Sequence, residues 1–267
     1  MHQPVDTRGM TGLASFDRFD ATYDGATYPV FRGGRGPAVI VMHEIPNLHP
    51  GVIAFGQRVV AAGFTVYMPS LFGEPGVALT AGTNARSLLR ACISREFSTW
   101  ATRRTSPITR WLRALARDAH AACGGPGVGA VGMCLTGGFA LAMMVDDTVV
   151  APVLSQPSIP FPIGPAQRRD LGVCDDDLAA IRARTDTCVM GLRFTGDLLV
   201  PAERFARLRA ELGERFIAIE IDSRRGNPHG IRRLAHSVLA YDYIDTPGHP
   251  TREALDRVLG FFRERLA

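Results

Sequence analysis

A cysteine in the middle of the chain lies between a predicted buried strand and a predicted helix. The apolar run 128–131 leads into Gly132-Met133-Cys134-Leu135-Thr136-Gly137-Gly138, and an apolar stretch follows. A tight strand-to-helix turn holds its central residue at the apex in strained backbone angles, and small neighbours such as Gly132 and Gly137 make room for it. The free N–H groups and the dipole of the helix N-terminus favour a thiolate there. The pattern therefore predicts Cys134 as a nucleophile.

This turn departs from the usual pattern at one position. Glycine normally stands two residues after the nucleophile, and this chain has Thr136 there, with the glycines one residue later. A free cysteine at such a junction is also often a small hydrophobe that only packs. The motif alone leaves both interpretations of Cys134 open.

An activated nucleophile needs a base, and the base needs an acid that orients it. We expect the order nucleophile, acid, base along the chain. Asp197 follows a predicted strand, immediately before a predicted helix, and is well placed to orient an imidazole. Asp186 and Asp222 are weaker candidates for the acid, because the first precedes its strand and the second lies in an arginine-rich loop.

The base should lie between the last strand and the closing helix. Three histidines occupy that stretch: His229, His236 and His249. Residue spacing alone does not choose among them.

The elements that must position these residues alternate between strands and helices. Apolar runs predict strands over 38–42, 64–68, 128–131, 148–154, 188–194 and 215–221, after two short strands around an Asp-Gly turn in 21–31. Helices are predicted over 50–63, most of 80–122, 135–145, 175–184, 201–212 and 251–266. This alternation is typical of an α/β domain with a mainly parallel sheet and helices on both faces. We predict an N-terminal arm over 1–20 and a single domain over 21–267.

The basic residues are all arginines, which removes whole classes of chemistry. None of the 30 Lys+Arg residues in this chain of 267 is a lysine. Schiff-base aldolases, pyridoxal-phosphate enzymes and P-loop phosphate binding all depend on a lysine amine. The net charge of +4 is not gathered into a basic stripe interleaved with aromatic residues, so we expect no nucleic-acid partner.

Cysteine usage and the start of the chain predict a cytoplasmic protein. The five cysteines are irregularly spaced without a C-x-x-C pair, and the first residues lack the basic start and apolar run of a signal peptide. An uncharged stretch over 119–145 is long enough to cross a bilayer. Its many glycines and Pro126 divide it into helix end, loop, strand and turn. We therefore expect a buried core and no membrane contact.

Four segments together resemble the dienelactone hydrolase family, the cysteine-nucleophile members of the α/β-hydrolase fold. They are Val41-Met42-His43-Glu44-Ile45, Gly132-Met133-Cys134-Leu135 with Gly137-Gly138, Thr195-Gly196-Asp197-Leu198-Leu199-Val200-Pro201, and Ala235-His236-Ser237. Each motif alone is weak, but their order and separations span most of the chain. The resemblance implies an α/β-hydrolase fold and hydrolysis of small esters or lactones. We expect no cofactor and no metal.

The resemblance also selects the base. In this family the catalytic histidine is followed by serine or glycine and then an apolar residue, which matches His236 before Ser237 and Val238. The implied catalytic triad is Cys134, Asp197 and His236, acting through an acyl-thioester.

Residues near the triad match the family as well. Glu44 matches a glutamate that takes part in activating the thiol, and the backbone N–H groups of Ile45 and Leu135 match the oxyanion hole. His43 matches a common neighbour of the site, for which we expect a structural role.

The chain departs from the family where the substrate is held. The type enzymes bind a substrate carboxylate with arginines, one of them four residues after the catalytic histidine, and this chain has Ala240 there. The connection from Asp222 to Pro250 is also long, so the rim of the site has been rebuilt. Arg95, Arg103 and Arg104 are candidates to replace the lost contact, although solvated helix faces account for them as well.

The predicted function is hydrolysis of small esters or lactones, and the expected partner is a small-molecule ester or lactone substrate. A thioesterase or acyl transferase using the same triad is an alternative. A non-catalytic binding or redox-sensing protein, in which Cys134 is oxidised, is another. The sequence leaves a monomer and a homodimer equally open.

Overall fold

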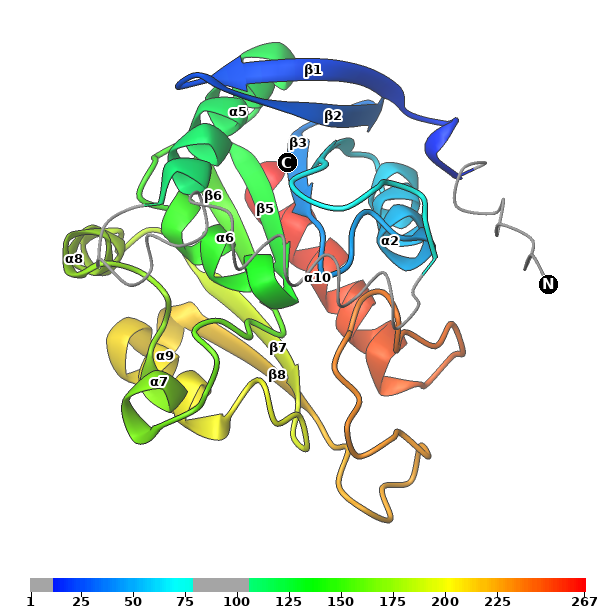
Figure 1. The fold of residues 1–267 in the computed structure, drawn as a ribbon, viewed down its shortest axis with the longest axis vertical. Coiled ribbons are helices and arrows are strands. Elements are labelled where there is room, and N and C mark those ends of the chain that lie inside the picture. The colour runs from blue at the N-terminus through cyan, green and yellow to red at the C-terminus, as the bar shows by residue number, and fades with distance from the viewer. Residues whose placement is uncertain (1–11, 79–105) are drawn as a thin grey trace.

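The computed structural model describes residues 12–78 and 106–267, in which eight strands form one sheet (Figure 1). The spatial order is β1-β2-β4-β3-β5-β6-β7-β8. Strand β2 pairs antiparallel with β1 and β4, and the remaining neighbours are parallel. The predicted mainly parallel sheet is thereby confirmed. The strands are β1 (Asp17–Tyr23), β2 (Ala26–Gly34), β3 (Ala38–Met42), β4 (Thr65–Pro69), β5 (Val128–Met133), β6 (Val149–Ser155), β7 (Val189–Phe194) and β8 (Phe216–Ile221).

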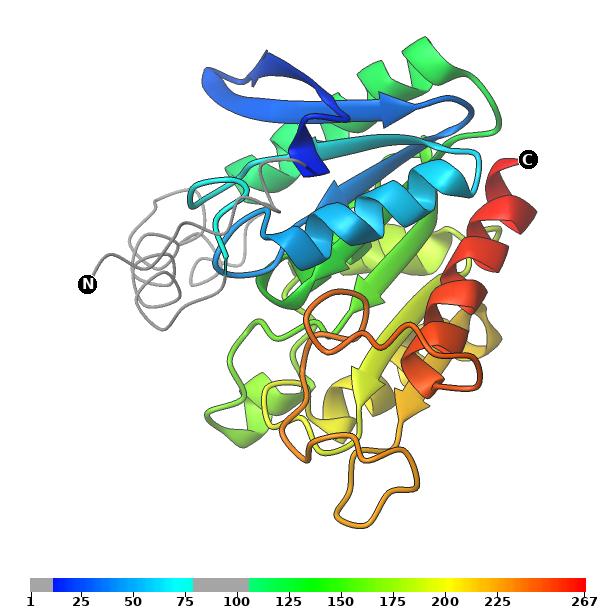
Figure 2. The same cartoon turned by 90° about the vertical axis from the view of Figure 1, so that its right-hand side faces the viewer.

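Helices cover both faces of this sheet, as Figures 1 and 2 show. One apolar core contains buried residues of α5 (Pro107–Cys123), α6 (Gly137–Met143), α8 (Asp175–Ala183) and α9 (Ala202–Leu212). The other contains buried residues of α2 (Pro50–Ala61) and α10 (Pro250–Leu266). Strand β3 contributes Ile40 and Met42 to the first core and Val39 and Val41 to the second. Successive strand residues point to opposite faces, so this uninterrupted apolar run is buried on both sides.

Several boundaries differ from the predicted ones. Strand β1 begins at Asp17, so the boundary at residue 20 predicted for the arm falls inside it. The predicted helix over 135–145 begins as a 3-10 turn, η2 (Cys134–Thr136), and continues as α6 only to Met143. A short helix, α7 (Pro165–Arg169), and a second 3-10 turn, η3 (Gly213–Arg215), were not predicted. Of the predicted helical region 80–122, residues 79–105 lie outside the described part of the chain, and α5 covers the remainder.

The uncharged stretch over 119–145 is divided among several elements, as predicted. It contains the end of α5, all of β5, the turn η2 and α6. None of the helices in residues 12–78 and 106–267 is long and apolar enough to cross a membrane.

The candidate residues lie at the edge of the sheet that is formed by the carboxyl ends of its parallel strands. Cys134 directly follows β5, Glu44 comes just after β3, and Asp197 comes just after β7. In open parallel sheets, ligands bind outside the carboxyl ends of the strands. The fold therefore gathers at this edge residues that are far apart in the sequence.

Candidate active site

The turn at Cys134 has the geometry that the sequence predicted. Cys134 has φ = 53°, a left-handed conformation that is strained for a residue with a side chain. A Cβ on Gly132 would lie 2.1 Å from the carbonyl oxygen of Thr136, and one on Gly137 would lie 2.5 Å from Cα of Pro157. Both positions therefore require glycine.

Thr136 explains the departure from the usual glycine pattern. Its side chain is fully buried. Its Oγ1 accepts the N–H of Met133 at 2.9 Å and lies 3.1 Å from the carbonyl oxygen of Met42. The threonine therefore closes the turn with its own hydroxyl and ties it to β3.

The sulfur of Cys134 has a partner that the sequence did not suggest. Its Sγ lies 3.2 Å from Oγ of Ser158, a fully buried residue. The backbone N–H of Ser158 donates to the carbonyl oxygen of Cys134 at 3.1 Å. Polar residues immediately after the carboxyl end of β6 were the available signal, because β5 and β6 are neighbours and Met133 pairs with Ser155.

The structure brings Asp197 and His236 together. Nδ1 of His236 lies 2.6 Å from Oδ2 of Asp197, whose Oδ1 accepts the backbone N–H of Leu199 at 2.9 Å. Asp197 is buried. Asp242 holds the histidine loop by accepting the backbone N–H groups of His236 and Ser237 at 2.8 and 3.0 Å.

The other nitrogen of this histidine is the one left to interact with the cysteine. Among the described residues, the buried Nε2 of His236 has no hydrogen-bond partner. Burial opposes the charged imidazolium. The negative charge of a Cys134 thiolate, together with the hydrogen bond to Asp197 and the charge of that carboxylate, outweighs burial and holds the pKa of His236 well above its usual value. This nitrogen is therefore suited to exchanging protons at the cysteine.

Glu44 lies at the same edge, buried, with hydrogen bonds that do not involve the sulfur. Its Oε1 lies 2.8 Å from Nε2 of His49 and 2.7 Å from Oγ of Ser237, and its Oε2 accepts Nε2 of Gln156 at 2.8 Å. Burial alone would raise the pKa of Glu44. The hydrogen bonds from His49 and Ser237, together with the charge of His236, lower it below its usual value.

The two residues expected to offer backbone N–H groups follow two neighbouring strands, β3 and β5. Leu135 follows Cys134 directly, and Ile45 follows Glu44 and joins Pro46 through a cis peptide bond. Strands β3 and β5 pair in parallel with Met42 opposite Gly132. This register brings the ends of the two strands side by side.

His43 is a structural residue, as expected. Its fully buried ring accepts the N–H of Leu71 at Nε2, 3.0 Å away, so Nδ1 carries the hydrogen that is donated to the carbonyl oxygen of Glu44 at 2.9 Å. Burial lowers its pKa to about 4. Both nitrogens are thus occupied by the backbone.

The remaining candidates bond elsewhere. His249 caps the N-terminus of α10, and its ring lies 5.8 Å from that of His229, centroid to centroid. Asp186 bonds Arg184, and Asp222 bonds Arg224. Arg95, Arg103 and Arg104 lie outside the described residues. Within the described ranges, no group of three or more His, Cys, Asp or Glu side chains could hold a metal ion.

Comparison with known proteins decides the family. A model of the dienelactone hydrolase family matches residues 26–266. The chain belongs to the dienelactone hydrolase family. A comparison with curated protein sequences returned no match.

Solved structures share the fold of this dienelactone hydrolase family member at low sequence identity. A dienelactone hydrolase from Anabaena variabilis is 15% identical with a TM-score of 0.59, and the match covers 95% of this chain and 100% of that one. A dienelactone hydrolase-like promiscuous phosphotriesterase from metagenomic libraries is 16% identical, with a TM-score of 0.64 and coverage of 94% and 98%. A cold-adapted esterase from an Arctic intertidal metagenomic library is 15% identical, with a TM-score of 0.57 and 94% coverage of each chain.

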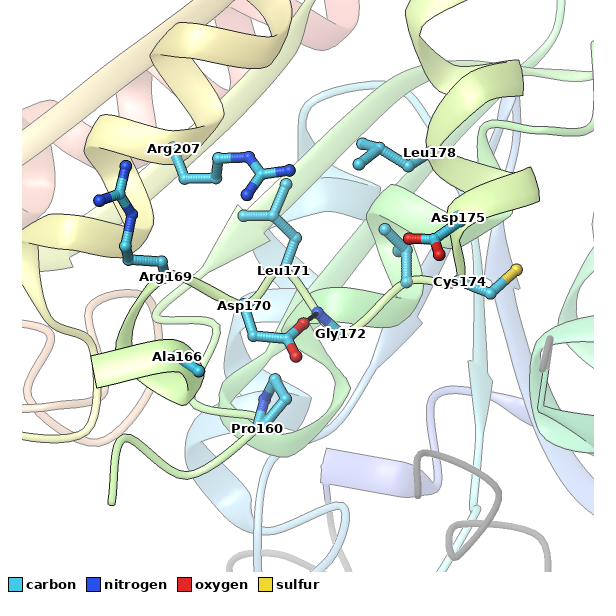
Figure 3. A pocket seen from close by; sticks show the side chains of 11 residues that line it. Pro160, Ala166, Arg169, Asp170, Leu171, Gly172, Cys174, Asp175, Leu178 and Arg207 are labelled. Atoms are coloured by element: carbon cyan, nitrogen blue, oxygen red, sulfur yellow. Dashed lines mark hydrogen bonds between the residues drawn. The ribbon is translucent and has the colours of Figure 1, made fainter. Parts of the chain in front are cut away.

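Two pockets lie beside α7 and α9. One of about 360 Å³ opens between α7, α8 and α9, and Arg169, Asp170 and Arg207 are among its lining residues (Figure 3). None of Cys134, Asp197 and His236 lines it. The other, of about 490 Å³, reaches Asp197 and is lined by five arginines at positions 168, 193, 224, 225 and 233.

Proposed function

We propose that this protein hydrolyses small carboxylic esters or lactones through an acyl-thioester on Cys134. The observation that carries the proposal is the left-handed Cys134 at the apex of its turn, on the same sheet edge as the hydrogen-bonded pair His236–Asp197. A nucleophile, a base within its field and an acid that orients the base are the parts that acyl transfer requires.

In the first half-reaction, the Cys134 thiolate attacks the carbonyl carbon, and the carbonyl electrons move to oxygen. The N–H groups of Ile45 and Leu135 stabilise this oxyanion, each contributing roughly 3–4 kcal/mol to the barrier reduction. As the tetrahedral species collapses, the bond to the leaving oxygen breaks and His236 protonates that oxygen. For a lactone, the released alcohol stays attached to the acyl group.

In the second half-reaction, His236 takes a proton from water, and the resulting hydroxide attacks the thioester. Collapse expels the Cys134 thiolate and leaves a carboxylic acid. Asp197 holds Nδ1–H in place throughout, so that Nε2 faces the reacting atoms, and it stabilises the imidazolium.

Trapping of the acyl-enzyme tests this proposal. The protein is mixed with a chromogenic short-chain ester, quenched in acid and examined by peptide mass spectrometry. We expect the acyl mass on Cys134, and no acyl mass and no turnover with Cys134→Ala. Cys188→Ala removes another thiol and serves as the matched control. Full turnover by Cys134→Ala would overturn the proposal, and a strong preference for thioesters over oxygen esters would favour the thioesterase alternative.

We also propose a cytoplasmic location for this enzyme. The support is chemical, since all four described cysteines are free thiols and the reaction requires Cys134 to remain reduced. Oxidation of Cys134 without turnover of any ester would instead favour the redox-sensing alternative.

A further inference from the structure

The carboxylate of Glu44 joins three segments that are distant in the sequence. His49 precedes α2, Gln156 follows β6, and Ser237 directly follows His236. All four side chains are buried. The three contacts measure 2.7–2.8 Å, the lengths of charge-assisted hydrogen bonds.

The direction of each hydrogen bond follows from the other contacts of the partner. Nδ1 of His49 accepts the N–H of Gly51 at 3.1 Å, so the ring hydrogen is on Nε2, facing Glu44. Oγ of Ser237 accepts the N–H of Tyr241 at 2.8 Å, so its own hydrogen is left for Glu44.

Gln156 is oriented in the same way. Its Oε1 accepts the backbone N–H of Val238 at 3.3 Å and faces the hydroxyl of Ser155, so its Nε2 must face Glu44. All three partners therefore donate, and Glu44 only accepts. An ionised carboxylate satisfies this arrangement, whereas a protonated one would set a donor against a donor.

These bonds link the loop of the base to the loop of the thiol. Glu44 holds Ser237 and Gln156 holds Val238, the two residues after His236. Two residues beyond Gln156, Ser158 contacts the sulfur of Cys134.

We propose that Glu44, His49 and Gln156 are positioning residues that, together with Ser237, form a buried carboxylate clamp setting His236 and Ser158 relative to Cys134. The proposal rests on the function proposed above, in which His236 is the base. It assigns to His49 and Gln156 a role in the reaction, and it gives Glu44 an action through hydrogen-bond geometry in place of direct action on the thiol.

A swap of two side chains tests the clamp. In Glu44→Gln, Oε1 still accepts from His49 and Ser237, but the new amide Nε2 meets the amide Nε2 of Gln156. We expect kcat for a short-chain ester to fall about 10- to 100-fold with KM changed less than about twofold, because displaced catalytic groups affect the chemical step.

The single variant Gln156→Glu and the double variant Glu44→Gln/Gln156→Glu should behave differently. Gln156→Glu places two carboxylates face to face. The decrease in kcat relative to the native protein should therefore be larger at pH 8 than at pH 6, where a shared proton relieves the repulsion. In Glu44→Gln/Gln156→Glu, the carboxylate at 156 accepts from the new amide, from Ser155 and from Val238. This double variant should recover kcat to within about threefold of the native value, which a loss of stability in either single variant would not produce.

A third variant separates the clamp from a direct effect of the Glu44 charge. Ser237→Ala removes one donor and leaves the carboxylate in place. We expect the pH midpoint of Cys134 alkylation by iodoacetamide to shift in Ser237→Ala and in Glu44→Gln, and to return in the double variant. Alkylation needs no substrate, so this readout stands even if the ester is the wrong one, and thermal unfolding shows which variants are folded.

Two results would overturn the clamp. One is a double variant no more active than the worse single variant. The other is an alkylation midpoint in Ser237→Ala equal to that of the native protein. Exposed Glu214→Gln is the matched control for removal of a carboxylate and should leave kcat and the alkylation midpoint unchanged.

Discussion

The turn that carries Cys134 and the loop that carries His236 are positioned in opposite ways. The turn is short and local, and its shape follows from Gly132, Thr136 and Gly137 within five residues of one another in the sequence. The loop over 222–249 has no helix or strand, although all its residues are described. It is held by side chains from other segments, namely Asp197, Gln156 and Glu44.

This difference has a physical consequence for evolution and for engineering. A local turn is specified by close backbone packing, so a single added methyl group breaks it. A loop held by buried hydrogen bonds loses position in steps, one bond at a time, and its exposed residues are free to change. We therefore expect the turn to tolerate no larger residue at Gly132 or Gly137. The loop should tolerate substitutions at its exposed residues but not at the residues that make its buried hydrogen bonds.

Gly132→Ala should produce the largest effect. The new Cβ would lie 2.1 Å from the carbonyl oxygen of Thr136 and 2.9 Å from Cα of Gly137, both backbone atoms that cannot move aside. We expect a destabilisation at or above the ~3 kcal/mol upper end of ordinary overpacking costs, with all ester turnover lost. Gly260→Ala, in α10 with nothing within 4 Å of the added Cβ, is the control and should keep full activity. Thermal unfolding and turnover measure both, and an active Gly132→Ala would contradict the local account of the turn.

His236→Ala should have the second-largest effect, because it removes the proposed general base, which is carried by the loop. Turnover should fall by on the order of 10²–10⁴-fold, the usual range for loss of a general base, while the fold remains. His229→Ala and His249→Ala change histidines whose rings contact each other and the start of α10, so kcat should change far less. If His229→Ala were the damaging variant, the choice of His236 as the base would be wrong.

Residues whose positions depend on local structure could be predicted from the sequence alone. Cys134 and Asp197 were predicted from local patterns, because a turn between a strand and a helix leaves a signature of glycines and apolar residues. The boundaries of β3, β7 and α2 were predicted within two residues for the same reason. His236 required the family resemblance, since three histidines occupy the same connection.

Contacts between distant segments could not be predicted in this way. Gln156 and Glu44 are 112 positions apart, and their contact depends on β3, β5 and β6 being neighbours in one register. Thr136 looked like a departure from the pattern because its hydroxyl bonds to β3, across 94 positions. The lesson is that polar residues just after each parallel strand should be considered together as soon as a parallel sheet is predicted.

Ala240→Arg tests whether this half-buried position of the loop sets substrate preference. The type enzymes of the family have an arginine at this position, and a hydrogen bond to a charged group contributes about 1.5–3 kcal/mol. We expect kcat/KM for a lactone with a free carboxylate to rise about 10- to 100-fold, with no gain for its methyl ester. Ala240→Gln gives a shorter side chain that donates hydrogen bonds without the charge. An equal gain with glutamine would rule out recognition of the carboxylate.

The smallest expected effect concerns stability against pH at the clamp. The hydrogen bonds of Glu44 lower its pKa in the folded protein. A carboxyl whose folded pKa lies below its unfolded value contributes stability that is present above the unfolded pKa, which is about 4.3 for glutamate. That contribution is lost as the pH falls through the folded pKa.

The native protein should therefore be more stable than Glu44→Gln at pH 6 to 7, and the difference in free energy of unfolding should shrink steadily from pH 5 downward. Urea unfolding of both proteins at a series of pH values measures this, with Glu214→Gln at an exposed position as the control for removal of a carboxylate. A difference between native and Glu44→Gln proteins that does not change between pH 6 and pH 3 would mean that Glu44 is not the ionised acceptor of three donors. The loop of His236 would then be held by Asp197, Gln156, Asp242 and packing.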